Sequence, residues 1–193
     1  GRKDIVNAGT FAAIVGTRKC CEISAQLSFK VSGMLVERGW SIASGLAQGV
    51  DAAAHRGALF GNGTTVACLG HGLDRIYPAC HSSLADSMVN REGALLTEYL
   101  PGSRTAPWHF AARNRLVVGI SQALVLIESP IKGGAMVSAA CAIDSGRDLW
   151  VYRPKHWTRR WEGNQALIEA YPETAWSDPE QLMDKMGLAC SNQ

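Results

Sequence analysis

The stretch "FAAIVGTRKCCEISAQLSFKVSGMLVERGWSIASG", residues 11–45, determines the fold class. It begins with a short apolar run, 11–17, and closes with a second apolar run, 40–45. Between them, residues 22–39 carry apolar side chains near helical spacing and stop at Gly39. Two buried strands joined by an amphipathic helix form the unit from which parallel sheets are built.

The same alternation continues to the end of the chain. Further apolar runs predict strands at 64–70, 94–100, 123–129 and 148–153. Amphipathic segments predict helices at 51–61 (with Asp51 as N-cap), 82–93, 109–121 and 135–145, and two short closing helices at 164–171 and 178–187. Strands that are apolar on both faces and alternate with helices predict a doubly wound α/β fold. Its sheet would be mainly parallel, with helices on both faces.

Length and composition limit the class of protein. A chain of 193 residues suffices for one good-sized core, and we find no repeat, low-complexity tract or linker. We therefore expect a single domain over 1–193, with its core at about 11–170 and a closing segment at 171–193. Apolar residues make up 47% and charged residues 19%, which is typical of a soluble globular protein.

Charge and targeting signals are weak. The formal net charge is only +2, so a nucleic-acid partner would require basic side chains gathered on one face. No run approaches the roughly 18 apolar residues of a membrane span, and the start lacks a signal-peptide layout. We expect a cytoplasmic protein without a membrane partner.

The six cysteines show no CxxC pair, and we interpret them as mostly buried, reduced thiols. Cys68, His71, Cys80 and His81 could in principle gather around zinc. However, their spacing matches no common site, and Cys68 lies in an apolar run. We predict neither a metal nor a cofactor.

Three loops that follow predicted strands contain the residues of a phosphate-binding rim. Parallel sheets bind ligands beyond the carboxyl ends of their strands. Small residues expose backbone N–H groups at a helix start, and arginine or lysine supplies positive charge. The candidates are Gly16, Thr17 and Arg18 after the first strand, Ser44, Gly45, Gly49 and Asp51 after the second, and Lys132, Gly133 and Gly134 after 123–129.

Two common nucleotide-binding signatures are absent. The chain has no GxxxxGK[ST] loop, and "GHGLDR" (70–75) lacks the third glycine of the dinucleotide fingerprint. These absences disfavour an ATPase and an NAD enzyme.

Several motifs resemble one family. They are "AIVGTRK", "SGLAQGVDAAAHRGAL", "TVACLGHGLDRIYP", "LLTEYLPG", "HFAARNRLVVGISQALVLIE" and "GRDLWVYRP" followed by "GNQALI". In order, from about Phe11 to Ala170, they look like the DNA-processing protein A (DprA/Smf) family. The resemblance implies a Rossmann-like domain that binds single-stranded DNA and helps load a RecA-type recombinase in natural transformation. It also implies homodimerisation, and flanking modules that we do not expect within these 193 residues.

The resemblance assigns roles to individual residues. Arg18 would hold a backbone phosphate, and the 44–51 loop would offer backbone donors to another. Phe110 would lie beside a base. Arg113, Asn114 and Arg115 would line the same pocket, and Lys132 with its two following glycines would close the rim. Asn164 is a further candidate for contact with DNA or phosphate. An alternative is that Arg113 or Arg115 pairs with a carboxylate such as Glu98 or Glu128.

The basic segment "YRPKHWTRRWEGN" (152–164) departs from the short proline–glycine loop of the family. Lys155, Arg159 and Arg160 could face phosphates, or the segment could be an ordinary loop. We expect Trp157 to pack on the sheet edge, whereas for Trp161 packing and base stacking both stay open.

Enzymatic function is the main alternative. Lonely Guy-type phosphoribohydrolases of the same superfamily carry a glutamate in a PGGxGTxxE loop. Here "GGAMVSAA" (133–140) has alanines where that carboxylate would fall, and Asp144 lies too far along. Asp51 and His55, one helical turn apart, fit a helix cap and a helix-face histidine better than a catalytic pair. We therefore predict a DNA-binding protein that is not an enzyme, with a small-nucleotide-binding protein as the other candidate.

Overall fold

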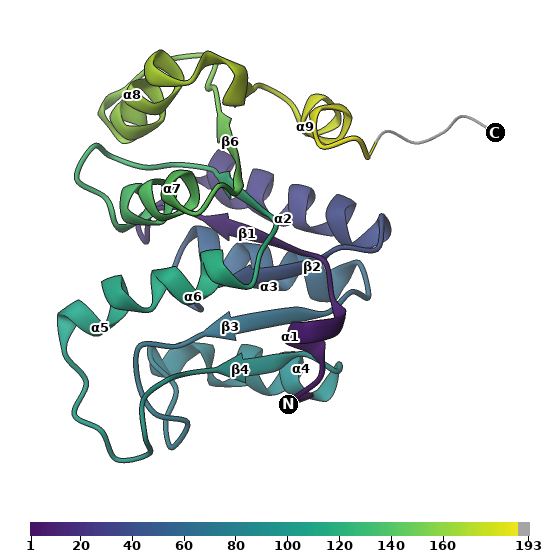
Figure 1. Ribbon diagram of the computed structural model, residues 1–193, viewed down its shortest axis with the longest axis vertical. Helices are drawn as coiled ribbons and strands as arrows, with labels where there is room; N and C mark the ends of the chain where they lie inside the picture. Colours follow the sequence, from purple (N-terminus) through teal and green to yellow (C-terminus); the bar gives the residue numbers. More distant parts are fainter. Residues whose placement is uncertain (189–193) are drawn as a thin grey trace.

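A seven-stranded parallel sheet runs through the computed structural model, which describes residues 1–188 (Figure 1). The strand order is β4-β3-β2-β1-β5-β6-β7, and every neighbouring pair is parallel. The strands are β1 (Phe11–Val15), β2 (Ser41–Ser44), β3 (Thr65–Cys68), β4 (Ala94–Leu96), β5 (Ala123–Leu126), β6 (Asp148–Tyr152) and β7 (Ala175–Trp176). The chain moves outward from β1 to β4 and then returns to β5 on the other side of β1. This order confirms the predicted doubly wound sheet.

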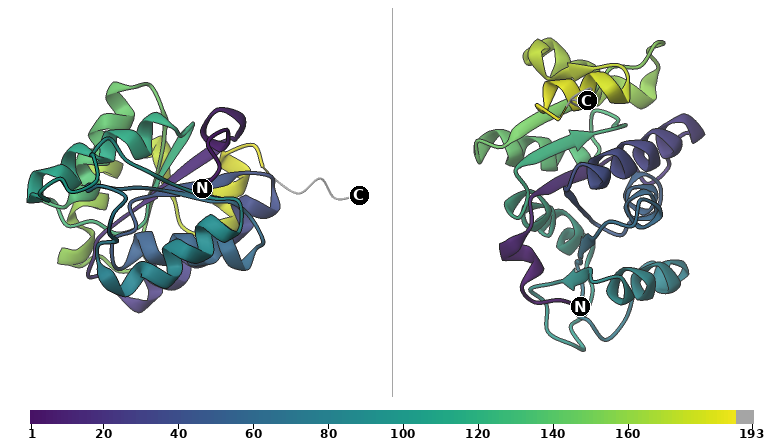
Figure 2. Two further views of the ribbon diagram at one scale, coloured as in Figure 1. Left: turned by 90° about the horizontal axis from the view of Figure 1, so that it is seen from below. Right: turned by 90° about the vertical axis from the view of Figure 1, so that its right-hand side faces the viewer.

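Helices cover both faces of the sheet (Figure 2). They are α1 (Ile5–Ala8), α2 (Glu22–Glu37), α3 (Val50–Phe60), α4 (Ser82–Asn90), α5 (Pro107–Ala112), α6 (Asn114–Gly119), α7 (Gly134–Asp144), α8 (Glu162–Ala170) and α9 (Pro179–Lys185). Buried side chains place α2, α3, α4 and α9 on one face and α1, α6, α7 and α8 on the other. No helix within residues 1–188 is long and apolar enough to cross a bilayer.

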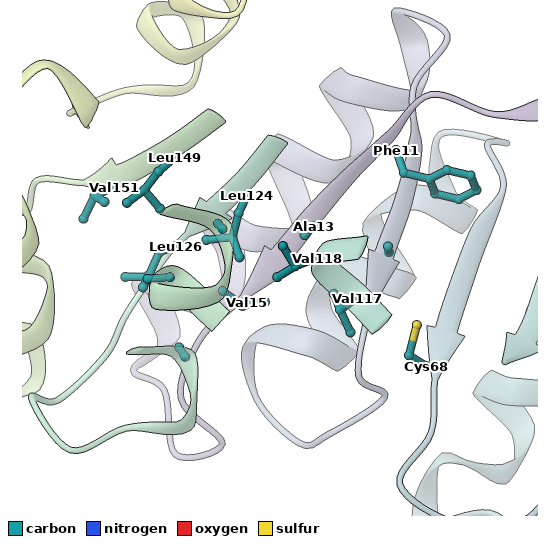
Figure 3. Close-up of a cluster of buried hydrophobic side chains, with 14 of the residues drawn as sticks. Phe11, Ala13, Val15, Cys68, Val117, Val118, Leu124, Leu126, Leu149 and Val151 are labelled. Carbon is teal, nitrogen blue, oxygen red and sulfur yellow. The ribbon is translucent and has the colours of Figure 1, made fainter. Parts of the chain in front are cut away.

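The two cores explain why the strands are apolar at every position. In β1, Phe11, Ala13 and Val15 pack against the face that carries α6 and α7, as Figure 3 shows. Ala12 and Ile14 face α2 and α3 and are fully buried. Because neither face of β1 meets water, the alternation typical of a one-sided sheet is absent from its sequence.

Some predicted element boundaries were wrong. The helix expected at 109–121 is divided into α5 and α6 at Arg113, where the N–H of Leu116 donates to the Arg113 carbonyl only three residues back. Helix α3 begins at Val50 with Gly49 as its N-cap, so Asp51 lies inside the first turn. The single-turn helix α1 and the two-residue strand β7 were not predicted, because neither is long enough to produce a periodic pattern. Residues 189–193 of the predicted closing segment lie outside the described part of the chain.

Candidate nucleic-acid interface

A cleft of about 420 Å³ lies at the carboxyl ends of β1, β2 and β5. The strand order reverses between β1 and β5, which is where doubly wound sheets open a crevice for ligands. All three predicted loops line the cleft, and α5 and α6 close it from the side to which these strands point (Figure 1). Among its lining residues are Gly16, Thr17, Arg18, Gly45, Asp51, Phe110, Arg113, Asn114, Gly133 and Gly134. The structure therefore brings ten of the predicted residues together.

The β1–α2 loop carries the exposed charge of the cleft. Arg18 and Lys19 are both exposed, and the guanidinium carbon of Arg18 lies 5.4 Å from the centroid of the Phe110 ring. The loop is anchored to β5 because the N–H of Thr17 donates to the Glu128 carbonyl at 2.8 Å. An exposed cation thus lies beside an aromatic ring at the cleft, an arrangement that favours an anion with a planar group attached.

The β2–α3 loop is shaped by Asp51. Its Oδ2 accepts hydrogen bonds from the N–H groups of Gly45 (3.1 Å) and Ala47 (3.3 Å). Burial raises the pKa of this carboxyl group, and the nearby Arg113 charge opposes the shift. Gly49 has φ +78°, and a Cβ there would lie 2.5 Å from the Thr17 carbonyl oxygen, so this tight turn against the first loop requires glycine.

Arg113 lies beneath the cleft and has little contact with solvent. Its side chain is 4% exposed, and Nη1 donates to the Cys68 carbonyl at 2.6 Å. Burial lowers the pKa of the guanidinium, whereas Asp51 raises it. Its Nε has no hydrogen-bond partner among the described residues. Gly45 allows this arrangement, because a Cβ at that position would overlap the guanidinium of Arg113.

The structure corrects several predicted contacts. Arg115 pairs with Glu98 and does not line the cleft, as the alternative interpretation had it. Ser44 is fully buried and donates to the Ile14 carbonyl at 2.6 Å. Asn164 is also fully buried: its amide donates to the Ile127 and Tyr152 carbonyls and accepts from the Ser129 N–H. Ser44 and Asn164 therefore position strand ends and have no surface to offer a ligand.

The β5–α7 loop supplies backbone donors. Gly133 and Gly134 line the cleft, and the first N–H groups of α7 have no acceptor within the helix. Asn114 fixes this helix start by donating from Nδ2 to the Gly134 carbonyl at 3.1 Å. Lys132 is exposed next to the cleft but does not line it.

Sequence reasoning missed other lining residues, namely Lys19, Ala47, Pro107, Ser129 and Ser138. Lys19 follows Arg18 directly, and Ser138 lies one helical turn after Gly134. Helical periodicity applied to the 133–140 stretch could have found Ser138.

The histidines and cysteines have other contacts. His71 and His81 direct Nδ1 to the carbonyls of Gly72 and Leu46, and residues 1–188 contain no cluster of potential metal ligands. His55 is fully buried with Nδ1 2.7 Å from the Thr65 hydroxyl, and burial lowers its pKa to about 3. Of the five described cysteines, only Cys68 is fully buried, so the expectation of mostly buried thiols was wrong.

Fold and site together define a Rossmann-like domain with a cleft at its topological switch point that is bordered by exposed Arg18 and Lys19. Residues 1–187 match the profile of the family described as DNA recombination-mediator protein A, and the chain belongs to this family.

Relatives agree with this assignment. The chain is 42% identical over 137 residues to protein Smf of Synechocystis, an alignment that covers 71% of this chain and 34% of that protein. The DprA structure from Streptococcus pneumoniae superposes with a TM-score of 0.84 at 30% identity, over 94% of this chain and 62% of that one. The structure of Helicobacter pylori DprA, described in terms of its single-stranded DNA binding mode, superposes with a TM-score of 0.80 at 25% identity. The superposition covers 96% of this chain and 84% of that one. The chain spans about a third of the length of the Synechocystis relative.

Proposed function

We propose that this cleft binds single-stranded DNA, with backbone phosphates against Arg18, Lys19 and the loop N–H groups and a base beside Phe110. Single-strand binders combine a positively charged groove with aromatic platforms, and both features occur here. The similarity to a DprA structure described with single-stranded DNA binding supports the same ligand class.

The observation that carries the proposal is the pairing of Arg18 with Phe110. Both border the cleft, and the arginine has no carboxylate partner within residues 1–188. A guanidinium that packs on an aromatic ring keeps its N–H groups directed outward and free for a phosphate. A nucleotide offers both a phosphate for the arginine and a base for the ring.

The cleft fits recognition better than bond breaking. Of the described residues that line it, Asp51 is the single carboxylate, and its Oδ2 already accepts two backbone N–H groups. General acid–base catalysis needs a carboxyl group directed at the scissile bond. We therefore favour a binding protein over a nucleoside-monophosphate hydrolase.

Fluorescence anisotropy with labelled oligo-dT tests the proposal. We expect affinity to rise with strand length and to fall with salt, with a log–log slope of about −0.7 per phosphate contact. Duplex DNA and nucleoside monophosphates serve as competitors. If a mononucleotide competes as well as a long strand does, the cleft binds a small ligand and the DNA proposal fails.

As further parts of the same proposal, the chain acts in DNA uptake or recombination in the cytoplasm, forms a homodimer and recruits a RecA-type recombinase. These roles rest on the family resemblance. Light scattering tests the dimer, and co-purification with a RecA-type recombinase in the presence of single-stranded DNA tests recruitment. A monodisperse monomer would refute dimerisation.

A further inference from the structure

A second basic feature lies beside the cleft, in residues 153–161 between β6 and α8. Together with the loops 16–21 and 130–134, this segment holds seven of the chain's 19 Lys and Arg residues and none of its 17 Asp and Glu residues. The three segments follow the neighbouring strands β1, β5 and β6, so they lie along one edge of the sheet. Positive charge is thus concentrated on one edge of a chain whose net charge is only +2.

The segment is held firmly against the β1–α2 loop. Arg160 donates from Nη1 to the Lys19 carbonyl at 3.0 Å and lies 3.5 Å from the buried carboxylate of Glu128. Trp161 is buried, with its ring centroid 5.4 Å from that of Tyr152. Of the two alternatives left open for Trp161, the structure shows packing on the sheet edge. Trp157, which we expected to pack there, is 42% exposed.

Lys155, Trp157 and Arg159 are among the exposed members of the segment. Lys155 and Arg159 are exposed and form no hydrogen bond or ion pair within the described part of the chain. Both line a groove of about 780 Å³ that also includes Cys21. Lys19 lines the first cleft and Cys21 lines the groove, so the two hollows lie at either end of residues 19–21 although they share no lining residue.

We propose that the single strand bound in the cleft continues across residues 19–21 into this groove. Lys155 and Arg159 contact its phosphates there, and a base stacks on Trp157, which lies between them in the sequence and is 42% exposed but is not among the residues that line the groove. The inference rests on the proposed function, which concerns the cleft alone. Its physical basis is charge complementarity with a polyanion, combined with an exposed aromatic face next to unpaired cations.

Anisotropy with strands of two lengths, about 6 and about 20 nucleotides, tests this extension. The test variants are Lys155→Ala/Arg159→Ala and Trp157→Ala. The matched control is Lys30→Ala/Arg56→Ala, which removes the same charge from exposed positions in the middle of α2 and α3.

We expect the double variant to weaken binding of the long strand and to reduce the magnitude of its salt slope by about 1.4, which is two phosphate contacts. Trp157→Ala should weaken the long strand roughly fivefold to a hundredfold, the loss of one stacked base. The short strand, which fills the cleft, should bind both variants as it binds the wild type. The control should match the wild type for both lengths.

Two results would overturn the extension. The first is that both test variants bind the long strand with the affinity and salt slope of the wild type. The second is that the test variants lose the same amount of affinity for the short strand as for the long one. Arg18→Ala distinguishes this failure from failure of the proposed function. If Arg18→Ala weakens both lengths while the groove variants do not, the cleft binds DNA without the groove. If Arg18→Ala has no effect either, the proposed function itself fails.

Discussion

Replacing Gly45 by alanine should destabilise the fold and the cleft together. The added Cβ would overlap the guanidinium of Arg113, which is 4% exposed and donates to the Cys68 carbonyl at 2.6 Å. Loss of a hydrogen bond from a charged donor costs about 1.5–3 kcal/mol. Overpacking of a close-packed site adds about 1–3 kcal/mol. We therefore expect the free energy of unfolding to fall by about 2.5–6 kcal/mol, a large part of the 5–15 kcal/mol typical of a domain.

Urea denaturation followed by tryptophan fluorescence measures this change, and Gly134→Ala provides the matched control. A Cβ at Gly134 meets no atom within 4 Å, and the backbone N–H at the start of α7 is retained. The control should unfold at or slightly above the wild-type midpoint. A Gly45→Ala protein with the wild-type midpoint would show that Arg113 can leave its buried position without cost, which would refute the reasoning.

Three further predictions follow from individual contacts. Arg18→Ala should weaken oligo-dT binding roughly tenfold or more and reduce the magnitude of the salt slope by about 0.7. Arg18→Lys keeps the charge and should keep the wild-type salt slope. Equal salt slopes for the wild type and both variants would contradict a phosphate contact at this position. Arg115→Ala should leave both DNA affinity and stability within about 0.5 kcal/mol of wild type, because its partner is the exposed Glu98; thermal unfolding and anisotropy check this. Folding lowers the pKa of His55 from 6.5 to about 3. Its contribution to the free energy of unfolding is therefore complete above pH 6.5 and is lost as pH falls toward 3. Between these values the free energy of unfolding should change by up to about 1.4 kcal/mol per pH unit. His55→Gln should remove this component from urea midpoints measured between pH 7 and pH 4, and an unchanged profile would count against it.

The sheet was predictable from sequence because its strands are apolar runs at regular intervals. The run 11–17 contains β1 and the run 123–129 contains β5, and both pack on helices at each face. The break at Arg113 could not be predicted, because no glycine or proline lies next to it in the sequence to mark a helix end. In the structure, the Arg113 side chain at the break turns inward and donates to the Cys68 carbonyl.

The site was predictable as a set of loops but not residue by residue. Glycines in the loops after predicted strands predict tight turns, and the turns at Gly16, Gly45 and Gly133 do line the cleft. The sequence does not reveal which polar side chains turn inward. Asn164 and Ser44 look like ligand-binding residues in the sequence. In the structure, both side chains donate hydrogen bonds to backbone carbonyls at the strand ends.

The "SGLAQGVD" and "ARNR" motifs are linked through one buried charge. Arg113 of the second motif occupies space that Gly45 of the first motif leaves open. The carboxylate of Asp51, also in the first motif, stabilises the positive charge of Arg113. A buried guanidinium without such a carboxylate would be strongly destabilising. The same carboxylate holds the N–H groups of Gly45 and Ala47, so it fixes the loop shape while it stabilises the cation. The net positive charge at the cleft therefore comes from exposed Arg18 and Lys19, because Asp51 offsets the charge of buried Arg113.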